Sequence, residues 1–225
     1  MYKPNRSCFE QINSQKICLV IAHPDDECMF FGPIIQTLLK NKSNSLYVLC
    51  MTTGDYNRLG KIRTKELKSS LLNLAGAECL KTVNIVDNPE LPDHPTVAWN
   101  REVCGDIIRS FIEENQLDIV ITFDPHGISA HPNHCFLYDT IKCLDFKAKP
   151  PVYILETVSL LRKYSLIFDL IFSMSFPSCL IAVSSPLEYI NTFRSMLKHV
   201  SQLVWFRWLY IVTSRYMFIN TLRKI

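Results

Sequence analysis

Short apolar runs alternate with helix-patterned segments along most of this chain, and no other feature limits the possible folds so strongly. The first run, residues 16–22, is apolar from Ile17 onward, as expected of a strand buried on both faces of a sheet. Residues 27–42 then repeat apolar side chains at helical spacing. Strands that alternate with helices predict a mostly parallel sheet joined by right-handed crossovers.

The same unit recurs along the sequence. A strand is expected at 45–51 and a helix at 59–75, which Gly76 should end. Further strands are expected at 82–86, 118–123 and 152–157, with helices at 97–115 and after His134. The chain has 225 residues and no linker rich in Pro, Gly or Ser. We therefore predict an α/β fold with one domain, 1–225: a Rossmann-like, doubly wound, mostly parallel sheet with helices on both faces.

Polar loops follow the first four expected strands. In a parallel sheet such loops share one edge, beyond the carboxyl ends of the strands, where ligands bind. The loop after the first strand begins with His23 and continues with three carboxylates at 25–27. The loop after the fourth strand ends with His131 and His134. Although these two loops are far apart in sequence, their side chains are expected to converge.

The residue types in these loops suit a metal ion. His131 and His134 are three positions apart, so both can point into one site. One of this pair, together with His23 and Asp26, makes a site of two histidines and one carboxylate, with an open position for water. This donor set favours zinc, although manganese or iron also fits it. A single histidine usually caps a helix or makes a hydrogen bond, but two tightly spaced pairs at one edge of the sheet indicate a metal site.

Composition excludes several classes of protein. The net charge of +3 is too small to indicate nucleic-acid binding. No Cys-x-x-Cys pair occurs among the nine cysteines, so we expect buried thiols in a reducing compartment. Cysteines within apolar runs are Cys18, Cys50, Cys143 and Cys179. The N-terminal residues are polar and lack the apolar core of a signal peptide.

The last third of the chain departs from the alternating pattern. Residues 166–183 are very apolar but contain Asp169 and Pro177, so we expect a buried strand with a helix, or an interfacial segment, and not a membrane-spanning helix. A helix is expected at 186–202. Residues 203–225 interleave aromatic residues with arginines and contain no carboxylate. They form either a helix that packs its aromatic stripe on the core or a basic aromatic element at a membrane surface.

Two segments resemble the signature motifs of a known superfamily. Ala-His-Pro-Asp-Asp-Glu at 22–27 and Ser-Ala-His-Pro-Asn-His at 129–134 resemble those of the LmbE-like zinc deacetylases, which remove N-acetyl groups from glucosamine-containing substrates. Other segments resemble one branch, the N-acetylglucosaminyl-phosphatidylinositol de-N-acetylase (PIG-L) family of glycosylphosphatidylinositol biosynthesis. These segments are 29–31, 91–93, 121–124, 155–156, 162–164, 205–207 and 214–217.

The resemblance implies a role for each motif residue. It implies that His23, Asp26 and His134 hold the zinc ion. It assigns Asp25 as the general base that takes a proton from the attacking water. It leaves His131 free to donate to the oxyanion of the tetrahedral intermediate.

Further residues are expected around this centre. By resemblance Arg63 contacts the inositol phosphate, and the alternative is a salt bridge on its helix with Glu66 or Glu102. Asp93 binds sugar hydroxyls or orients a zinc-bound histidine. Three residues are expected to orient the metal ligands without binding the metal themselves: Glu27, Asp124 and His126.

The resemblance implies a zinc-dependent hydrolase that releases acetate from N-acetylglucosaminyl-phosphatidylinositol, the second step of glycosylphosphatidylinositol-anchor biosynthesis, at the cytoplasmic face of the endoplasmic reticulum membrane. Another divalent metal can replace zinc. Members commonly carry an N-terminal spanning helix, whereas here the first strand is expected from residue 16. The apolar segment from Leu166 and the 203–225 element are therefore the candidates for docking on the membrane. Two alternatives stay open: a deacetylase of a soluble N-acetylglucosaminide, and a non-catalytic phosphoinositide-binding module.

Overall fold

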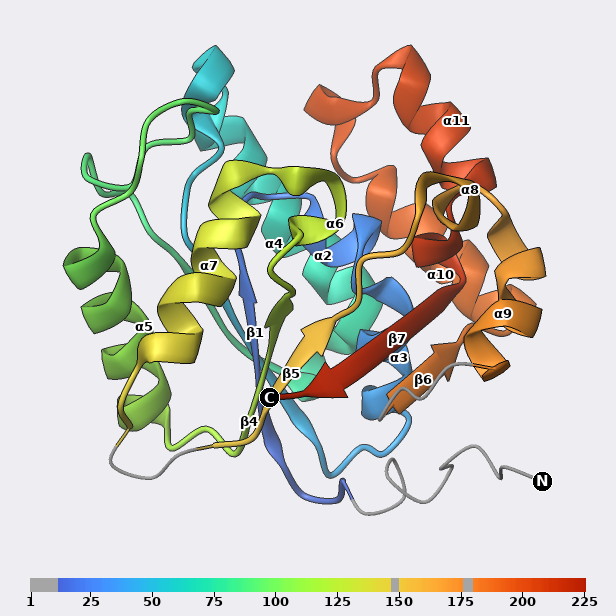
Figure 1. Cartoon of the computed structure of the whole chain (residues 1–225), viewed down its shortest axis with the longest axis horizontal. Helices are drawn as coiled ribbons and strands as arrows, with labels where there is room; N and C mark the ends of the chain where they lie inside the picture. Colours follow the sequence, from blue (N-terminus) through green and yellow to red (C-terminus); the bar gives the residue numbers. More distant parts are fainter. Residues whose placement is uncertain (1–11, 147–149, 176–179) are drawn as a thin grey trace.

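A seven-stranded sheet forms the centre of the molecule (Figure 1). The structure, a computed structural model, describes residues 12–146, 150–175 and 180–225. The strands lie in the order β3-β2-β1-β4-β5-β7-β6. The first five run parallel, and β7 pairs antiparallel with both β5 and β6. Their bounds are β1 Lys16–Ile21, β2 Ser45–Cys50, β3 Leu80–Ile85, β4 Ile119–Phe123, β5 Val152–Leu155, β6 Leu180–Val183 and β7 Ile219–Lys224.

Helices cover both faces of the sheet, as predicted (Figure 1). One layer contains α3 (Gly32–Leu39), α4 (Gly60–Cys79) and α10 (Pro186–Met196), which contact one another. The other contains α5 (Arg101–Asn115) and α7 (Pro132–Cys143). The shorter helices are α2 Asp26–Met29, α6 Gly127–Ala130, α8 Leu160–Lys163, α9 Asp169–Ser175 and α11 Trp205–Thr213, with 3-10 turns η1 Asp55–Asn57, η2 Leu166–Phe168, η3 Val200–Gln202 and η4 Arg215–Met217.

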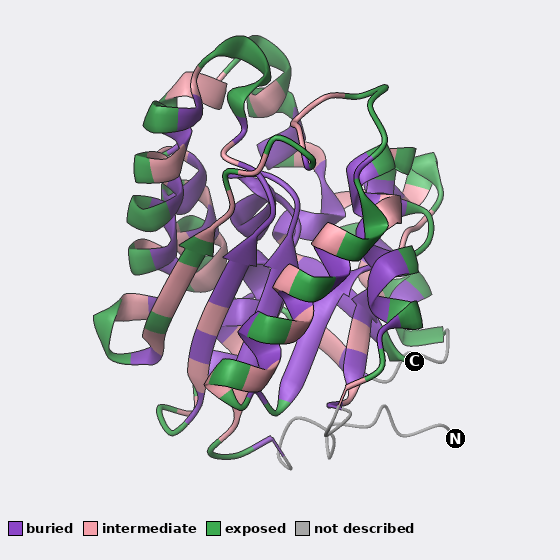
Figure 2. Ribbon diagram, turned by 90° about the vertical axis from the view of Figure 1, so that its left-hand side faces the viewer, coloured by how far each residue is buried: buried purple, intermediate pink, exposed green. Residues whose placement is uncertain are grey.

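The central strand β1 explains where the site lies. Its residues from Ile17 to Ile21 are all buried, which agrees with their unbroken apolar sequence (Figure 2). β1 pairs with β2 on one side and with β4 on the other. The chain order of the strands reverses between β1 and β4, and ligands of doubly wound sheets bind at such a reversal. The loops after β1 and β4 are therefore neighbours.

One expected helix was wrong, and the end of another was confirmed. The helix expected at 27–42 is divided into α2 and α3, because Pro33 lies in the first turn of α3 and cannot donate a hydrogen bond to a preceding turn. The helix expected to end at Gly76 is interrupted there, since glycine takes a non-helical φ of 73°, and the residues of α4 beyond it form a short further turn to Cys79.

The C-terminal residues differ most from the expectation. Residues 203–225 were expected to form either a helix packed on the core or a basic aromatic element at a membrane surface, but 219–224 are the interior strand β7. Arg215, one of the arginines of this segment, is fully buried with its Nε 2.7 Å from Asp169 Oδ2. The apolar segment 166–183 contains α9 and β6, while Pro177 lies outside the described residues.

Two further observations concern compartment and membrane. The seven cysteines in the described ranges are free thiols, and Cys143 is exposed although it was expected to be buried. Cys179 and the polar N-terminal residues lie outside those ranges. Within the described residues, each helix is too short or too polar to cross a membrane.

The Asp169–Arg215 pair leads to a prediction about stability. Asp169→Asn should lower the free energy of unfolding by about 3–5 kcal/mol, because it leaves a buried guanidinium without its counter-charge. Chemical denaturation of the purified protein measures this loss. Asp106→Asn is the control, since Asp106 forms a comparable 3.0 Å pair with Arg109 at the surface and should cost about 1 kcal/mol or less. Equal losses in the two variants would contradict the prediction.

Candidate active site

Three side chains that were predicted as metal ligands converge at the reversal point of the sheet. His23 and Asp26 come from the loop after β1 and the start of α2, and His134 comes from the first turn of α7. His134 Nε2 lies 3.3 Å from His23 Nδ1 and 3.3 Å from Asp26 Oδ1. His23 Nδ1 lies 3.7 Å from Asp26 Oδ2. All three residues are buried.

Hydrogen bonds on the far side of each ligand leave one donor atom free to point inward. His134 Nδ1 lies 3.1 Å from Gly127 O, which places its proton there and leaves Nε2 unprotonated. His23 Nε2 lies 3.2 Å from Asp93 Oδ1, which leaves its Nδ1 free. Asp26 Oδ2 accepts from the backbone N–H groups of Ala22 and His23, at 3.0 and 2.8 Å, so Oδ1 faces the histidines.

These free atoms fit a divalent metal ion. A tetrahedral ion with ligands at about 2.0–2.1 Å separates them by roughly 3.4 Å, and two of the three separations here are 3.3 Å. Burial would raise the pKa of the Asp26 carboxyl, but His134 and His23 beside it lower that pKa, so the carboxylate is ionised as a metal ligand must be. His131 also brings a nitrogen close to those of His23 and His134.

The loop between β4 and α7 is held in shape by Asp124. Its Oδ1 accepts from the backbone N–H of Gly127 at 3.0 Å, and its Oδ2 accepts from that of Thr157 at 2.7 Å. Gly127 has a φ of 55°, and a Cβ there would lie 2.7 Å from the Cβ of His134. Asp124 therefore supports His134 through the backbone of Gly127.

His131 lies beside the three ligands and faces the same cavity. Its Nδ1 accepts from the backbone N–H of Asn133 at 3.3 Å, which leaves Nε2 as the protonated nitrogen. Burial and the neighbouring His23 and His134 lower the pKa of His131 to about 4. The imidazole is therefore neutral at physiological pH and can donate one hydrogen bond from Nε2.

Asp25 occupies a strained backbone conformation at the edge of this cluster. Its φ is 125°, outside the region that non-glycine residues ordinarily adopt. Its carboxylate lies between two arginines, with Oδ1 3.6 Å from Arg63 Nη2 and Oδ2 3.1 Å from Arg207 Nη2. The sequence analysis placed Arg207 in an element that either packs on the core or lies at a membrane surface, and did not predict that its guanidinium faces the proposed base.

A second buried cluster lies behind Asp25. Glu27 Oε2 accepts from the backbone N–H of Asp25 at 3.1 Å. Its Oε1 lies 2.7 Å from His199 Nε2 and also accepts from the Ser70 hydroxyl. Burial would raise the pKa of Glu27, but His199 lowers it, so the pair is ionic. Glu27 therefore ties the strained Asp25 backbone to α4 and to the end of α10.

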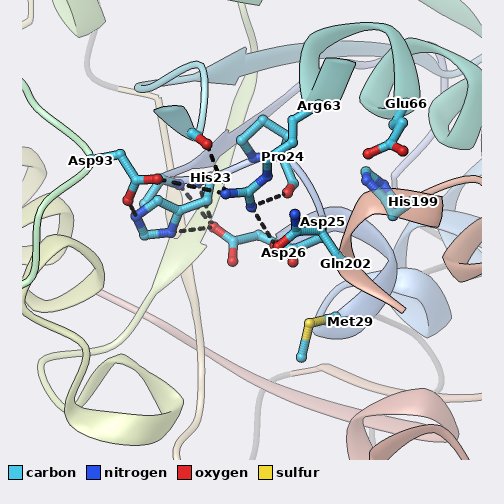
Figure 3. A network of polar contacts seen from close by, with 12 residues as sticks. His23, Pro24, Asp25, Asp26, Met29, Arg63, Glu66, Asp93, His199 and Gln202 are labelled. Atoms are coloured by element: carbon cyan, nitrogen blue, oxygen red, sulfur yellow. Dashed lines mark hydrogen bonds and ion pairs between the residues drawn. The ribbon is translucent and has the colours of Figure 1, made fainter. Parts of the chain in front are cut away.

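Arg63 and Asp93 connect the loops that follow β1, β2 and β3. Arg63 donates from Nη1 to Gly54 O at 3.0 Å and from Nη2 to Pro24 O at 2.6 Å (Figure 3). Asp93 Oδ2 lies 3.5 Å from Arg63 Nη1, while its Oδ1 orients His23. The alternative salt bridge of Arg63 is absent from the described structure, since Glu66 accepts from Ser201 instead.

His126 does not support the ligands in the way expected. Its side chain is exposed and does not line the cavity. Its backbone N–H donates to Asp124 Oδ1 at 3.1 Å, so it contributes to the loop only through its main chain. An exposed histidine three residues after a strand cannot be distinguished by sequence from one that turns inward.

The cluster lines a cavity of about 550 Å³, a usual size for a ligand pocket. Its walls come from the loops after β1, β2, β3 and β4, which were predicted to share one edge of the sheet, and also from α8 and α11. Four residues of this centre were missed in the sequence analysis: Asn133, Lys163, His199 and Arg207. Asn133, Lys163 and Arg207 lie within segments that carry the family resemblance, but no role at the site was assigned to them, and His199 lies outside those segments.

The chain was then compared with known proteins. A family model described as PIG-L: GlcNAc-PI de-N-acetylase matches residues 18–143. The chain is 39% identical over 210 residues to the N-acetylglucosaminyl-phosphatidylinositol de-N-acetylase of Bos taurus, covering 91% of this chain and 81% of the relative. It is 34% identical over 223 residues to the probable enzyme of that name from Schizosaccharomyces pombe, covering 96% and 89%.

Solved structures share the fold. The N,N'-diacetylchitobiose deacetylase from Pyrococcus horikoshii superposes with a TM-score of 0.63 over 100% of this chain and 94% of that one, at 16% sequence identity. At this identity the likeness indicates the shared architecture alone.

The geometry predicts which histidines bind metal. His134→Ala should weaken binding of a divalent metal by more than the roughly 10- to 100-fold that loss of an outer partner costs, because it removes a direct ligand. Metal content after dialysis, measured by elemental analysis, reports the change. His126→Ala is the matched control from the same loop and should keep its metal. Full metal content in the His134 variant would exclude His134 as a ligand.

Proposed function

The chain belongs to the PIG-L family, and from that premise we propose that it removes the acetyl group from N-acetylglucosaminyl-phosphatidylinositol. One observation carries the proposal: a single cavity brings together three metal-binding side chains, the carboxylate of Asp25 and the neutral imidazole of His131. These are the groups that hydrolysis of an amide requires. The products are glucosaminyl-phosphatidylinositol and acetate.

Zinc is the metal we propose for this site, because imidazole and carboxylate ligands favour it. His23, Asp26 and His134 would hold the ion. When bound, it supplies the Lewis acidity that makes water a nucleophile near neutral pH. Other divalent ions accept the same ligands.

The residues of the chain account for the proton transfers. As water attacks the acetamide carbonyl carbon, Asp25 takes one of its protons. His131 donates a hydrogen bond from Nε2 to the carbonyl oxygen as negative charge develops there. Asp25 then returns its proton to the nitrogen as the carbon–nitrogen bond breaks, so that the amine and acetic acid leave, and the acid gives up its proton to the amine or to water to become acetate. The hydrogen bond from the Asp25 backbone to Glu27 keeps the base in position.

The first functional prediction concerns Asp25. Asp25→Asn should lower kcat by about 10²- to 10⁴-fold, the usual contribution of a general base, while leaving the bound metal in place. Acetate release from the lipid-linked substrate and metal content are measured together. Asp106→Asn, a change to an exposed carboxylate on α5, is the control. Undiminished turnover in the Asp25 variant would refute its assignment as the base.

We also propose that the protein works at a membrane surface, on the cytoplasmic face of the endoplasmic reticulum. Free thiols in the described residues fit that reducing side. Helices α8, α9 and α11 lie together at one end of the molecule (Figure 1). With η2 they expose the side chains that we call the apolar face: Leu160, Leu161, Ile167, Phe168, Ile171, Phe172, Met174, Trp205, Phe206, Trp208, Leu209 and Val212.

A lipid bilayer is the partner that suits this face. Trp205 is 79% exposed and Phe168 71%, which is unusual for large aromatic residues in contact with water alone. Phe206 and Leu209 belong both to the apolar face and to the cavity lining. The face and the cavity are therefore continuous, so acyl chains can stay in lipid while the headgroup enters the site.

The membrane proposal predicts the effect of polar substitutions. Replacing Phe168, Phe172 and Trp205 together by serine should weaken binding to phosphatidylcholine vesicles that contain phosphatidylinositol by more than about 10-fold, since each buried large apolar side chain contributes about 1.5–3 kcal/mol. Vesicle flotation measures the change, and metal content verifies the fold. Serine at Ile62 and Leu72, two exposed apolar positions on α4, is the control. Equal binding by both variants would reject the proposed face.

A further inference from the structure

Lys163 has an unusual place for a lysine. It is the last residue of α8, its exposed fraction is 9%, and it lines the cavity that contains the metal-binding side chains. Its ammonium makes no ion pair with any carboxylate in the described part of the chain. The contact recorded for it is with the ring of the adjacent Tyr164, whose centroid lies 5.8 Å from Nζ.

Burial of such a group is costly. An ammonium that leaves water needs an opposite charge or several hydrogen bonds to compensate for lost solvation. Burial and the nearby guanidinium of Arg207 lower the pKa of Lys163, so its surroundings are both poorly solvated and positively charged. Two cations side by side in a cavity form a site for an anion.

The carboxylates of the cavity already have partners. Asp25 is paired with Arg63 and Arg207, Asp26 faces the metal-binding histidines, and Asp93 contacts His23. None of these contacts involves Lys163. The anion that compensates Lys163 must therefore come with a ligand.

Arg63, which the sequence analysis associated with the inositol phosphate, is less suited to that anion. It is 9% exposed, and its two terminal nitrogens donate to the backbone carbonyls of Pro24 and Gly54. These bonds hold the rim loops after β1 and β2 together. A phosphate at Arg63 would have to compete with them.

We propose that Lys163, with Arg207 beside it, forms the subsite that receives the phosphodiester group of the substrate, an inference that rests on the proposed function. The glycolipid carries one phosphodiester, negatively charged at neutral pH, between its inositol ring and its lipid. Lys163 belongs to the wall made by α8 and α11, whose outer side is the apolar face. A phosphodiester bound at this wall would lie between the cavity, which receives the headgroup, and the apolar face, which is next to the acyl chains.

This arrangement also gives Arg207 a second role. Its guanidinium reaches Asp25, and its Nε is buried without a hydrogen-bond partner in the described structure. A phosphodiester held at Lys163 can accept from Arg207, which links recognition of the charged lipid to the position of the base. No contact joins Lys163 to Asp25 among the described residues. A substitution at Lys163 therefore tests phosphodiester binding without also disturbing the proposed base.

The test compares two water-soluble substrates, so that vesicle binding plays no part. One is N-acetylglucosaminyl-phosphatidylinositol with short acyl chains, used below its aggregation concentration, and the other is N-acetylglucosaminyl-inositol without the phosphate. In Lys163→Met the ratio of kcat/KM on the first substrate to that on the second should fall by about 10- to 100-fold, the effect of losing a charge-assisted hydrogen bond. Lys163→Arg should restore most of the ratio, and Lys142→Met, at an exposed lysine on α7, should leave both values as they are.

A ratio that stays constant in Lys163→Met would overturn the subsite, whether both values fall or neither does. If Lys163→Met fails to fold, as judged by circular dichroism, Lys163→Gln takes its place. A second measurement separates the subsite from the reaction. Calorimetry should show that the unmodified protein binds inositol 1-phosphate more tightly than inositol and that the Lys163 variant loses this difference. Failure of the unmodified protein to release acetate refutes the proposed function, whereas equal binding of the two inositols refutes the subsite.

Discussion

The parallel pairing of β1 with β4 is the interaction on which the site depends. It is built from backbone hydrogen bonds between Ile17–Leu19 and Ile119–Ile121, and both strands are buried. Because parallel strands end at the same edge, this pairing brings His23 and Asp26 next to a loop that begins more than a hundred residues later. The convergence of the proposed metal ligands is thus a consequence of strand order, and the loops only refine it.

The C-terminal third completes what the sheet begins. Arg207 from α11 reaches the proposed base, and His199, just after α10, neutralises the buried carboxylate that holds the base. The buried pair of Asp169 and Arg215 fixes η4 and so the entry into β7. The pairs of His199 with Glu27 and of Asp169 with Arg215 are fully buried, so loss of one partner would leave a costly unpaired charge. The family model covers 18–143, yet the cavity is closed by residues beyond that range.

The cavity and the outer surface suit different parts of the proposed substrate. Inside are imidazoles, carboxylates and the cations Lys163 and Arg207, which suit an acetamide, two sugar-like rings and a phosphodiester. On the outer surface, α8 exposes Leu161, and α11 exposes Phe206 and Trp208. A substrate with a polar head and apolar tails needs both surfaces next to each other, since exposing its tails to water costs free energy. The proposals on membrane docking and on phosphate recognition are therefore consistent with each other.

From the sequence alone we could predict the mostly parallel sheet and the gathering of the polar loops at one edge of it, where His23, Asp26 and His134 meet. These follow from local patterns: apolar runs such as 16–22, helical spacing, and histidines spaced three apart. Glu27 and Asp124, which were expected near the site, do hydrogen-bond to its loops, whereas the exposed side chain of His126 and the ion pairs of Arg207 and Arg215 were not foreseen. Only the tertiary structure decided which buried charge meets which partner, and that 219–224 is an interior strand. The reason is physical: an arginine at a surface and one in a salt bridge have the same local sequence, and only the chain folded around it decides between them.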